Sequence, residues 1–346
     1  MKRTKVAIVG ASGYSGAQLV RYLLQHPGAE IVGVTSRQHL GKSLAEVFPR
    51  YRQTSAAVDQ KFMAADVAAV VATGAEVAFL AVPHGVAIEY VDPLLAAEMV
   101  VIDLSADFRL RDGAVYEEFY EAVHPRPDLL ASAVYGLPEA YAEEIRRANL
   151  IASPGCYPTS ILLPLLPLLR EKLIRPDSIH VFSMSGVSGA GRKESLPLLF
   201  CECTESARAY SVPKHRHLSE IEQELSIAAG ERVVISFTPH LIPTHSGIHT
   251  TIYAAPTGQG VDLNATYARA YGQAPFVRLL GANGCPDTKN VVGTNFLDLG
   301  WAYDARTHRY VLLSAEDNIG KGAGAQAVQS FNLRFGHPET LGLHLF

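Results

Sequence analysis

The sequence predicts an α/β protein of two domains: a Rossmann-type domain around a parallel sheet, then an α+β domain around a mixed or antiparallel sheet. Three observations carry this prediction. The chain has 346 residues, more than one ordinary hydrophobic core holds. Strand-like and helix-like segments alternate in its first half, which is typical of βαβ units. After about residue 150 the strand candidates are longer, and helices no longer follow each of them.

The elements of the first half follow from short apolar runs and helical spacing. Four runs have the composition of buried strands: 5–10, 30–36, 76–83 and 100–105. Apolar residues at helical spacing over 17–27 and 87–98 predict helices between them. We therefore expect a nucleotide-binding type of domain over residues 1–152.

The second half is predicted as a separate domain over residues 153–321. Its strand candidates are 178–189, 232–242 and 247–256. A last helical stretch, 323–336, is expected to return to the first domain, so that a C-terminal helix of about 322–346 completes it.

Composition and charge exclude several classes of protein. Hydrophobic residues make up 48% of the chain and the formal net charge is −4, so neither nucleic acid nor an anionic membrane is expected as a partner. The apolar run 161–169 is too short to span a bilayer. The basic start lacks the features of a signal peptide, and four cysteines do not make a disulfide framework. We expect a soluble cytoplasmic protein with reduced thiols and no metal.

A glycine-rich turn, GASGYSG, follows the first strand and opens the first helix. Glycines permit a tight turn and a close backbone approach to a pyrophosphate, and the helix N-terminus supplies N–H groups. The alternative is a turn that only packs helix on strand. The candidate cofactor-binding residues of this turn are Gly10, Ser12, Gly13, Tyr14, Ser15 and Gly16.

The end of the second strand indicates which dinucleotide binds. An NAD site places an acidic residue there for the ribose 2′-hydroxyl, whereas this strand ends in Ser36 and Arg37, and Glu30 lies at its other end. A hydroxyl and a guanidinium suit the 2′-phosphate of NADP(H). The alternative is that Arg37 is a solvated loop charge.

Cys156 is the candidate nucleophile. It lies in SPGCYPTS, where a Pro-Gly turn precedes an apolar run that reads as the start of a buried helix. A helix N-terminus stabilises a thiolate. The alternative is a small buried hydrophobic residue. The other three cysteines, Cys201, Cys203 and Cys285, lack this setting, and CEC is not a zinc-binding spacing.

The segment KHRHLSEIEQEL supplies the candidate acid–base residues, His215 and His217. Residues two apart in an extended segment point to the same side, so both can line one cleft. Ser219 and Glu222 have the spacing of a capping box for the helix that follows. The alternatives are surface histidines or a His-x-His metal pair.

At this point several motifs together resemble one family, the N-acetyl-γ-glutamyl-phosphate reductases of arginine biosynthesis. They are GASGYSG, DLSADFRL, SPGCYPTS, SGVSGAGRK, HRHLSEIEQ and DNIGKGAGAQAVQ, and the likeness runs from about residue 5 to the end of the sequence. More distantly, the chain is similar to aspartate-semialdehyde dehydrogenases and phosphorylating glyceraldehyde dehydrogenases.

The resemblance implies roles for individual residues. Cys156 falls on the family's catalytic cysteine, and the HRH segment carries its acid–base histidine, with His217 favoured over His215. Arg109 matches a phosphate-binding arginine, assisted by Ser105. The remaining positions are Ser188 and Gly189, nearest to cysteine and nicotinamide, and Asn318 and Lys321, in a second cofactor-contacting segment.

The implied activity is the NADPH-dependent reduction of an acyl phosphate to an aldehyde through a Cys156 thioester, in a homodimer or homotetramer. Two alternatives stay open: a reductase of carrier-linked aminoadipyl phosphate in lysine biosynthesis, and a non-catalytic NADP-binding sensor. The chain departs from the family at Ser219, where proline is common, and at Ser246, where arginine is usual. The second departure bears on the choice of substrate.

Overall fold

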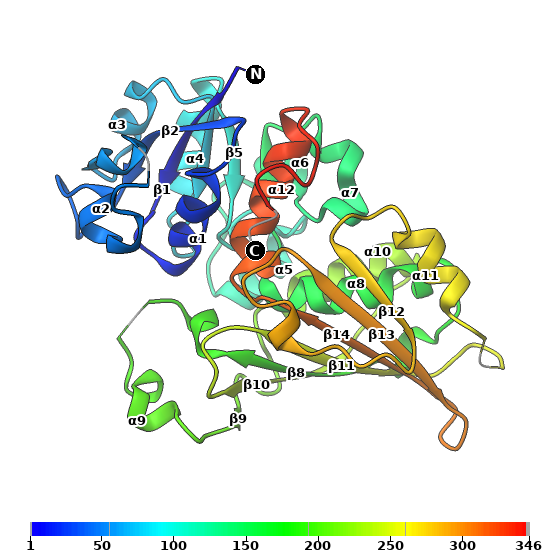
Figure 1. Cartoon of the computed structure of the whole chain (residues 1–346). Coiled ribbons are helices and arrows are strands. Elements are labelled where there is room, and N and C mark those ends of the chain that lie inside the picture. The colour runs from blue at the N-terminus through cyan, green and yellow to red at the C-terminus, as the bar shows by residue number, and fades with distance from the viewer. Residues whose placement is uncertain (1, 55, 193, 260, 344–346) are drawn as a thin grey trace. The chain divides into compact units, whose positions relative to one another are not determined.

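The computed structural model describes residues 2–54, 56–192, 194–259 and 261–343, which form two compact units (Figure 1). The first unit comprises the residues up to Glu117, the segment Ala122–Pro154, and the residues from Ala323 onward. The second comprises Glu118–Glu121 and Gly155–Gly322. None of the helices in the described ranges is long and apolar enough to cross a membrane.

The first unit is a parallel sheet with helical crossovers. Its sheet has seven strands in the order β3-β2-β1-β4-β5-β7-β6, all of them parallel. The strands are β1 (Thr4–Val9), β2 (Ala29–Thr35), β3 (Phe62–Met63), β4 (Val77–Leu80), β5 (Val100–Asp103), β6 (Val134–Tyr135) and β7 (Leu150–Ala152). The central strands are almost wholly buried and apolar, as a sheet covered on both faces requires.

The helices of this unit complete the doubly wound arrangement. They are α1 (Tyr14–Leu23), α2 (Leu44–Val47), α3 (Val67–Ala72), α4 (Ile88–Ala96), α5 (Gly113–Tyr120), α6 (Pro127–Ser132), α7 (Pro138–Ile145) and α12 (Ala325–Arg334). The late helix α12 is tied to the first unit, because Arg334 Nε donates to the carbonyl of Ala148 (2.6 Å) and Gln329 Nε2 to Glu139 (3.2 Å).

The second unit is built on a mixed seven-stranded sheet in the order β12-β13-β14-β11-β8-β10-β9. The β8–β10 and β12–β13 pairs are parallel and the other pairs antiparallel. The strands are β8 (His180–Gly186), β9 (Arg208–Ala209), β10 (Ser236–Ile242), β11 (Ile248–Ala254), β12 (Val277–Ala282), β13 (Leu297–Asp304) and β14 (Arg309–Glu316). With this sheet and the parallel sheet of the first unit, the predicted fold class is confirmed.

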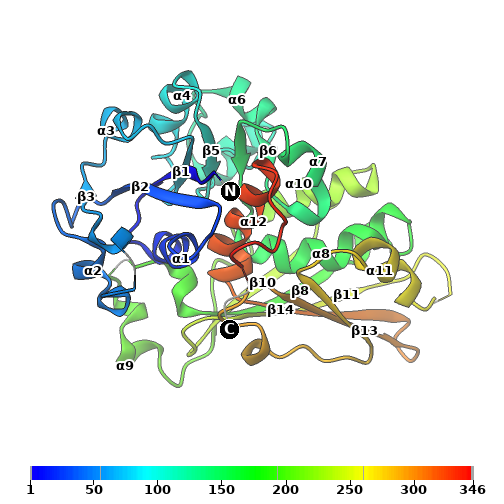
Figure 2. The same ribbon diagram turned by 45° about the horizontal axis from the view of Figure 1, so that its top comes forward.

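One face of the mixed sheet carries three helices, α8 (Cys156–Arg170), α10 (Leu218–Ala229) and α11 (Asn264–Tyr271), as both ribbon views show (Figures 1 and 2). A fourth helix, α9 (Phe200–Cys203), lies in the segment between β8 and β9. Residues 157–169 of α8 are all buried, so this helix forms the centre of the unit's core.

Two prolines inside α8 are accommodated by side chains from distant parts of the chain. Pro164 and Pro167 have no N–H, which deprives the carbonyls of Ser160 and Leu163 of their helical partners. Ser314 donates to the first of these carbonyls (2.7 Å) and the Tyr271 hydroxyl to the second (2.6 Å). The buried helix that begins at Cys156 therefore has its freed carbonyls satisfied.

Candidate active site

Cys156 is the first residue of α8. The preceding residue, Gly155, is in extended conformation (φ −67°, ψ 162°) and provides no side-chain cap. Pro158 in the first turn has no N–H to contribute. Cys156 is partly exposed and forms no disulfide. The thiol thus lies at the positive end of a fifteen-residue helix.

Glu220 and His217 surround the residue that precedes the cysteine. The backbone N–H of Gly155 donates to Glu220 Oε2 (3.1 Å), and Glu220 Oε1 lies 4.0 Å from His217 Nε2. A Cβ on Gly155 would meet His217 Nε2 at 2.7 Å and Glu220 Oε1 at 2.8 Å. Only glycine leaves room here for the imidazole and the carboxylate to approach the Cys156 turn.

His215 lies beside His217 but is engaged differently. Its Nδ1 accepts a hydrogen bond from the backbone N–H of His217 (3.1 Å), and the two ring centroids are 4.8 Å apart. Its ring also packs edge-on against Tyr157 and Tyr210. Burial, reinforced by the nearby Arg216 charge, lowers the pKa of His215 to about 4, so the ring is neutral near pH 7.

These groups line a cavity of about 280 Å³. Its wall includes Cys156, His215, His217, Tyr210 and Ser185. The Tyr210 hydroxyl is hydrogen-bonded to the Tyr157 hydroxyl at 2.8 Å. The structure therefore brings the predicted nucleophile and both predicted histidines to one cavity within the second unit.

The segment that follows β14 packs closely against Cys156. A Cβ on Gly322 would lie 2.8 Å from Cys156 Cβ and 3.0 Å from Glu316 Oε1, so this glycine too is required by close packing. Lys321, one of the predicted cofactor-contacting residues, is fully buried, and its ammonium lies 5.9 Å from the centre of the Phe276 ring.

Asn318, Ser188 and Gly189 form a second group of predicted site residues. Asn318 accepts a hydrogen bond from the Gly247 N–H (2.8 Å) and donates to Ser188 Oγ (2.9 Å). Gly189 lines the cavity, and a Cβ there would meet Asn318 Nδ2 at 3.4 Å. Ser246 lies beside this group, 3.2 Å from Ser188 Oγ. Asn318 thus positions the loop that carries Ser188.

In the first unit, the glycine turn has the backbone that a pyrophosphate cradle needs. Gly10 has φ +81°, and a Cβ there would lie 2.4 Å from the Ala81 carbonyl oxygen. Gly16 packs against the same turn, because its Cβ would lie 2.4 Å from the Gly10 oxygen. Gly13 precedes α1 and gives it no side-chain cap, and Tyr14 and Ser15 form the first turn. This arrangement fits a dinucleotide phosphate at the N-terminus of α1.

The end of β2 is tied to this turn. Ser12 Oγ and Ser36 Oγ are 2.9 Å apart, and the N–H of Gln38 donates to Ser36 Oγ (3.2 Å). The Thr35 hydroxyl accepts from the N–H of Gly10 (3.1 Å). Ser36 is therefore buried within the turn, whereas the neighbouring Arg37 is exposed.

Arg109 and Ser105 lie in the loop after β5 in the first unit. Arg109 Nε donates to the carbonyl of Ser153 (2.7 Å) and Nη2 to that of Leu104 (3.0 Å), which fixes the guanidinium at the carboxyl ends of β5 and β7. The Ser105 hydroxyl donates to Asp103 (2.7 Å). Burial, together with Asp107, raises the pKa of Asp103 to about 7.

One local prediction was wrong. Helix α10 begins at Leu218 with His217 as its N-terminal flanking residue, so Ser219 and Glu222 do not form a capping box. The Ser219 hydroxyl donates to the Arg216 carbonyl (2.7 Å), and Glu222 accepts from the Ile235 N–H (3.1 Å). The helix therefore begins before the predicted Ser219 cap, and His217 at its start faces Gly155.

Sequence reasoning also missed Glu220 and Arg208. Glu220 follows His217 by three residues, a spacing that places both on one side of a helix, and this signal was available. Arg208 lines the cavity from β9, a two-residue strand that no local pattern indicates. Nowhere in the described ranges are three His, Cys, Asp or Glu side chains grouped to hold a metal ion.

Comparison with known proteins identifies the class of protein to which this chain belongs. Residues 5–148 match the NAD binding domain of semialdehyde dehydrogenases, and residues 156–318 match the semialdehyde dehydrogenase dimerisation domain. The structure resembles aspartate semialdehyde dehydrogenase II of Vibrio cholerae, in complex with ASA (TM-score 0.72, 17% identity, covering 97% of this chain and 99% of that one). It also resembles the Candida albicans enzyme with NADP (TM-score 0.69, 14% identity, 96% and 99% covered). The fold is that of the semialdehyde dehydrogenases, a class of oxidoreductases.

Relatives found by sequence identify one family within this class. An N-acetyl-gamma-glutamyl-phosphate reductase of Akkermansia muciniphila is 60% identical over 346 residues, covering 99% of both chains. One of Citrifermentans bemidjiense is 48% identical over 344 residues, covering 99% of this chain and 98% of its own. The chain belongs to the N-acetyl-gamma-glutamyl-phosphate reductase family, which confirms the family indicated by the sequence motifs.

Proposed function

We propose that this chain reduces N-acetyl-γ-glutamyl phosphate to N-acetylglutamate 5-semialdehyde with NADPH and releases phosphate, as a step of arginine biosynthesis. The observation that carries the proposal is Cys156 at the N-terminus of α8, in one cavity with His217. Relatives of this name match over nearly the full chain. The proposed compartment is the cytoplasm, where cysteines stay reduced.

Cys156 is the proposed nucleophile. The positive end of α8 stabilises its thiolate, which attacks the acyl carbonyl carbon. The carbon–oxygen bond to phosphate breaks, and a thioester on Cys156 remains. Backbone N–H groups of this helix start are the donors suited to the charge that develops on the carbonyl oxygen.

His217 is the proposed acid–base residue. It gives a proton to the carbonyl oxygen when the thioester is reduced to a thiohemiacetal. It takes this proton back when the carbon–sulfur bond breaks, which releases the aldehyde and restores the Cys156 thiolate; in the reverse direction the same transfers occur in the opposite order. Its ring lies against Gly155 and 4.0 Å from Glu220, which orients it. His215 is proposed to position His217 rather than to transfer the proton, because its Nδ1 already accepts from the backbone.

Arg109 is proposed to receive the phosphate, with Ser105 holding its loop. The guanidinium is fixed by two backbone carbonyls, and its planar shape matches phosphate. Ser188 and Gly189 are proposed to contact the reacting groups, since the loop that carries them is fixed by Asn318.

NADPH, when bound, supplies the hydride that reduces the thioester carbonyl. The turn over Gly10, Ser12, Gly13, Tyr14, Ser15 and Gly16 is proposed to hold its pyrophosphate. Exposed Arg37 is the proposed contact for the 2′-phosphate, and Ser36 shapes the turn beneath it. Asn318 and Lys321 are proposed to support the nicotinamide end.

The reverse reaction tests this proposal. Purified protein is mixed with N-acetylglutamate semialdehyde, phosphate and NADP⁺, and NADPH absorbance is followed. We expect NADPH formation that depends on phosphate and that is abolished in Cys156→Ala. Turnover only with an aminoadipate-type semialdehyde would move the substrate to the lysine pathway. Absence of turnover with either aldehyde would refute the proposed activity.

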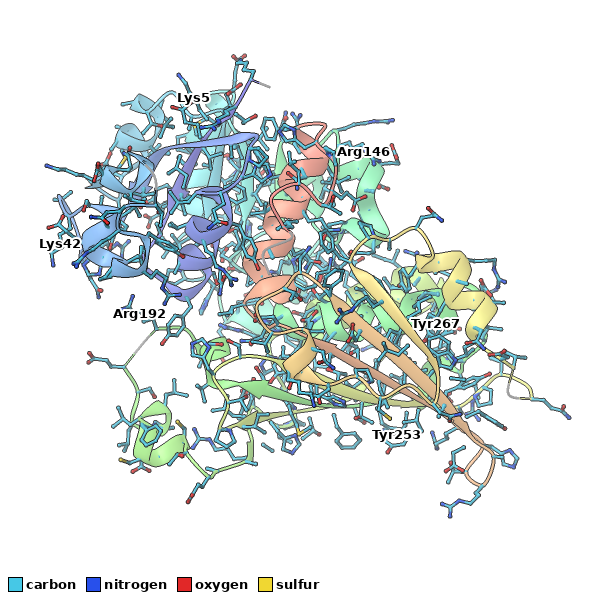
Figure 3. The ribbon with its side chains drawn as sticks, in the orientation of Figure 1. Lys5, Lys42, Arg146, Arg192, Tyr253 and Tyr267 are labelled. Carbon is cyan, nitrogen blue, oxygen red and sulfur yellow. The ribbon has the colours of Figure 1, made fainter. Side chains whose placement is uncertain are left out.

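We further propose that the chain forms a homodimer or homotetramer through the open face of the mixed sheet. On this face β8 exposes Phe182 (46%) and Met184 (42%), and Phe182 lies 6.4 Å from the ring of Tyr253 on β11. Tyr253 projects on the side opposite to Tyr267 of α11 (Figure 3). An exposed apolar sheet face favours association, and this unit matches a dimerisation domain.

A further inference from the structure

The cavity beside Cys156 has arginine side chains on its wall. Arg208 and Arg216 both line it, and among the described residues that form its wall none is an aspartate or a glutamate. His215 adds no charge near pH 7, because burial lowers its pKa to about 4. An arginine on the wall of a small cavity attracts an anion that binds there.

Arg208 is held in a fixed orientation within the second unit. It belongs to β9 at the edge of the mixed sheet, where it pairs with Leu241 of β10. Its Nη2 donates to the carbonyl of Pro197 (2.7 Å), and Pro197 and Leu241 line the same cavity. A guanidinium anchored in this way loses little side-chain entropy when it binds a planar anion, and its geometry suits a carboxylate.

The size of the cavity indicates what kind of anion it holds. Its volume of about 280 Å³ is near the lower end of small-molecule pockets, which hold about 300–1,000 Å³. A substrate whose carbonyl carbon reaches Cys156 must place the rest of its body here. In an N-acetylglutamyl substrate that body ends in an α-carboxylate, which takes no part in the reaction.

We propose that Arg208 binds the α-carboxylate of the substrate and thereby selects N-acetylglutamyl compounds over analogues without that group. This inference rests on the proposed function. It assigns to Arg208 a specificity role that is separate from the phosphate site proposed around Arg109 in the first unit.

The reverse reaction allows binding of the α-carboxylate and binding of phosphate to be measured separately. In that direction the semialdehyde, which carries the carboxylate, and phosphate are two different substrates. In Arg208→Met we expect KM for N-acetylglutamate semialdehyde to rise by about 10–100-fold, the usual effect of losing a charged hydrogen-bond pair. KM for phosphate and for NADP⁺ stays unchanged. A rise in KM for phosphate instead, with an unchanged KM for the aldehyde, would overturn the proposal.

A truncated aldehyde gives the sharper comparison. 4-Acetamidobutanal lacks only the α-carboxylate, so the wild type should lose kcat/KM with it by the same factor that Arg208→Met loses with the full substrate. Arg208→Met should show no further loss with this aldehyde. Arg208→Lys keeps the charge without the planar fork and should fall between the two. Arg306→Met, at an exposed arginine of the β13–β14 turn, is the matched control and should behave as wild type.

Binding without turnover keeps this test independent of the proposed activity. N-acetyl-L-glutamate should slow alkylation of Cys156 in the wild type, and 4-acetamidobutanoate should not. In Arg208→Met this difference disappears while the unprotected alkylation rate is retained. If the wild type turned over no semialdehyde, the proposed function would fail, yet selective protection would still support Arg208. Equal protection by N-acetyl-L-glutamate in wild type and Arg208→Met would overturn the inference.

Discussion

At the scale of single residues, two histidines separated by one residue are expected to have different roles. His217 faces Gly155 and Glu220, whereas the Nδ1 of His215 is used by a backbone N–H. In the reverse assay, His217→Asn should therefore lower kcat by about 10²–10⁴-fold, the usual contribution of a general acid–base residue. His215→Asn, whose side-chain oxygen can replace the lost acceptor, should lower kcat much less. Equal losses in the two variants would contradict the assignment of His217.

The same His215→Asn variant tests how burial of this ring affects stability. The pKa of His215 is lowered to about 4 in the fold from its ordinary value of 6.5. Between these values the unfolded chain binds the proton and the folded chain does not, so the fold loses stability as pH falls from 6.5 towards 4. The advantage of wild type over His215→Asn in urea unfolding should be roughly 2 kcal/mol smaller at pH 5 than at pH 8. A difference that does not change with pH would show that His215 is not buried as a neutral ring.

Some residues of the site could be predicted from the sequence, and others could not. Cys156 and the two histidines could be predicted, because a Pro-Gly turn before an apolar run and a His-x-His segment are local signals. The different roles proposed for the two histidines could not be predicted from the sequence. They depend on where α10 begins and on the Gly155 turn, which lies 62 residues away from His217 in the chain. Arg208 reaches the cavity only through its pairing with β10.

At the scale of elements, the glycine turn and helix α1 are closely packed against each other. A Cβ on Gly16 would strike the backbone of Gly10 and Ala11 at 2.4 and 2.6 Å, whereas a Cβ on Gly13 would make an ordinary contact at 3.6 Å. Gly16→Ala should therefore destabilise the fold by about 1–3 kcal/mol. Gly13→Ala, the matched control, should cost no more than about 1 kcal/mol. Denaturant unfolding of the two variants measures this, and equal costs would mean that the turn is not closely packed.

The end of β2 gives a prediction about cofactor choice. Ser36 is buried against Ser12, while Arg37 is exposed, so Arg37 is the group expected to meet a 2′-phosphate. Arg37→Ala should raise KM for NADP⁺ by about tenfold and leave KM for NAD⁺ unchanged. Parallel kinetics with the two cofactors check this. If both KM values rose equally, Arg37 would support the turn in general rather than recognise the phosphate.

Some elements could be predicted only in part. The apolar run after Cys156 indicated the start of a buried helix, and the run contains two prolines. Helix α8 continues through both because Ser314 and Tyr271, each more than 100 residues away, satisfy the freed carbonyls. No local sequence pattern indicates hydrogen bonds from residues so far away in the chain. The predicted capping box was wrong because α10 already begins at Leu218, and the Ser219 hydroxyl donates to the Arg216 carbonyl instead.

At the scale of the whole molecule, the two sheets differ in how well sequence predicts them. Alternating strands and helices indicate a parallel sheet, because each crossover returns the chain in the same direction. The second sheet places β8 between β11 and β10, parallel to one and antiparallel to the other, and no periodicity records that order.

Assembly of the molecule gives a further prediction. If the open face of the mixed sheet joins two copies, charges placed on it should separate them. The double variant Phe182→Glu, Met184→Glu should elute at half the wild-type mass or less in size-exclusion chromatography with light scattering. Ile227→Glu, at a similarly exposed residue of α10 on the other side of the unit (50% exposed), is the control and should leave the mass unchanged. An unchanged mass in the double variant would place the interface elsewhere.

The proposed reaction depends on a covalent thioester at Cys156. The most direct measurement is intact mass spectrometry after the protein is mixed with N-acetyl-γ-glutamyl phosphate in the absence of cofactor, with rapid acid quenching. We predict that one N-acetylglutamyl group is added per chain, that it maps to the peptide containing Cys156, and that Cys156→Ala does not acquire it. Turnover by the wild type with no covalent adduct on Cys156, or an adduct that persists in Cys156→Ala, would contradict the thioester mechanism.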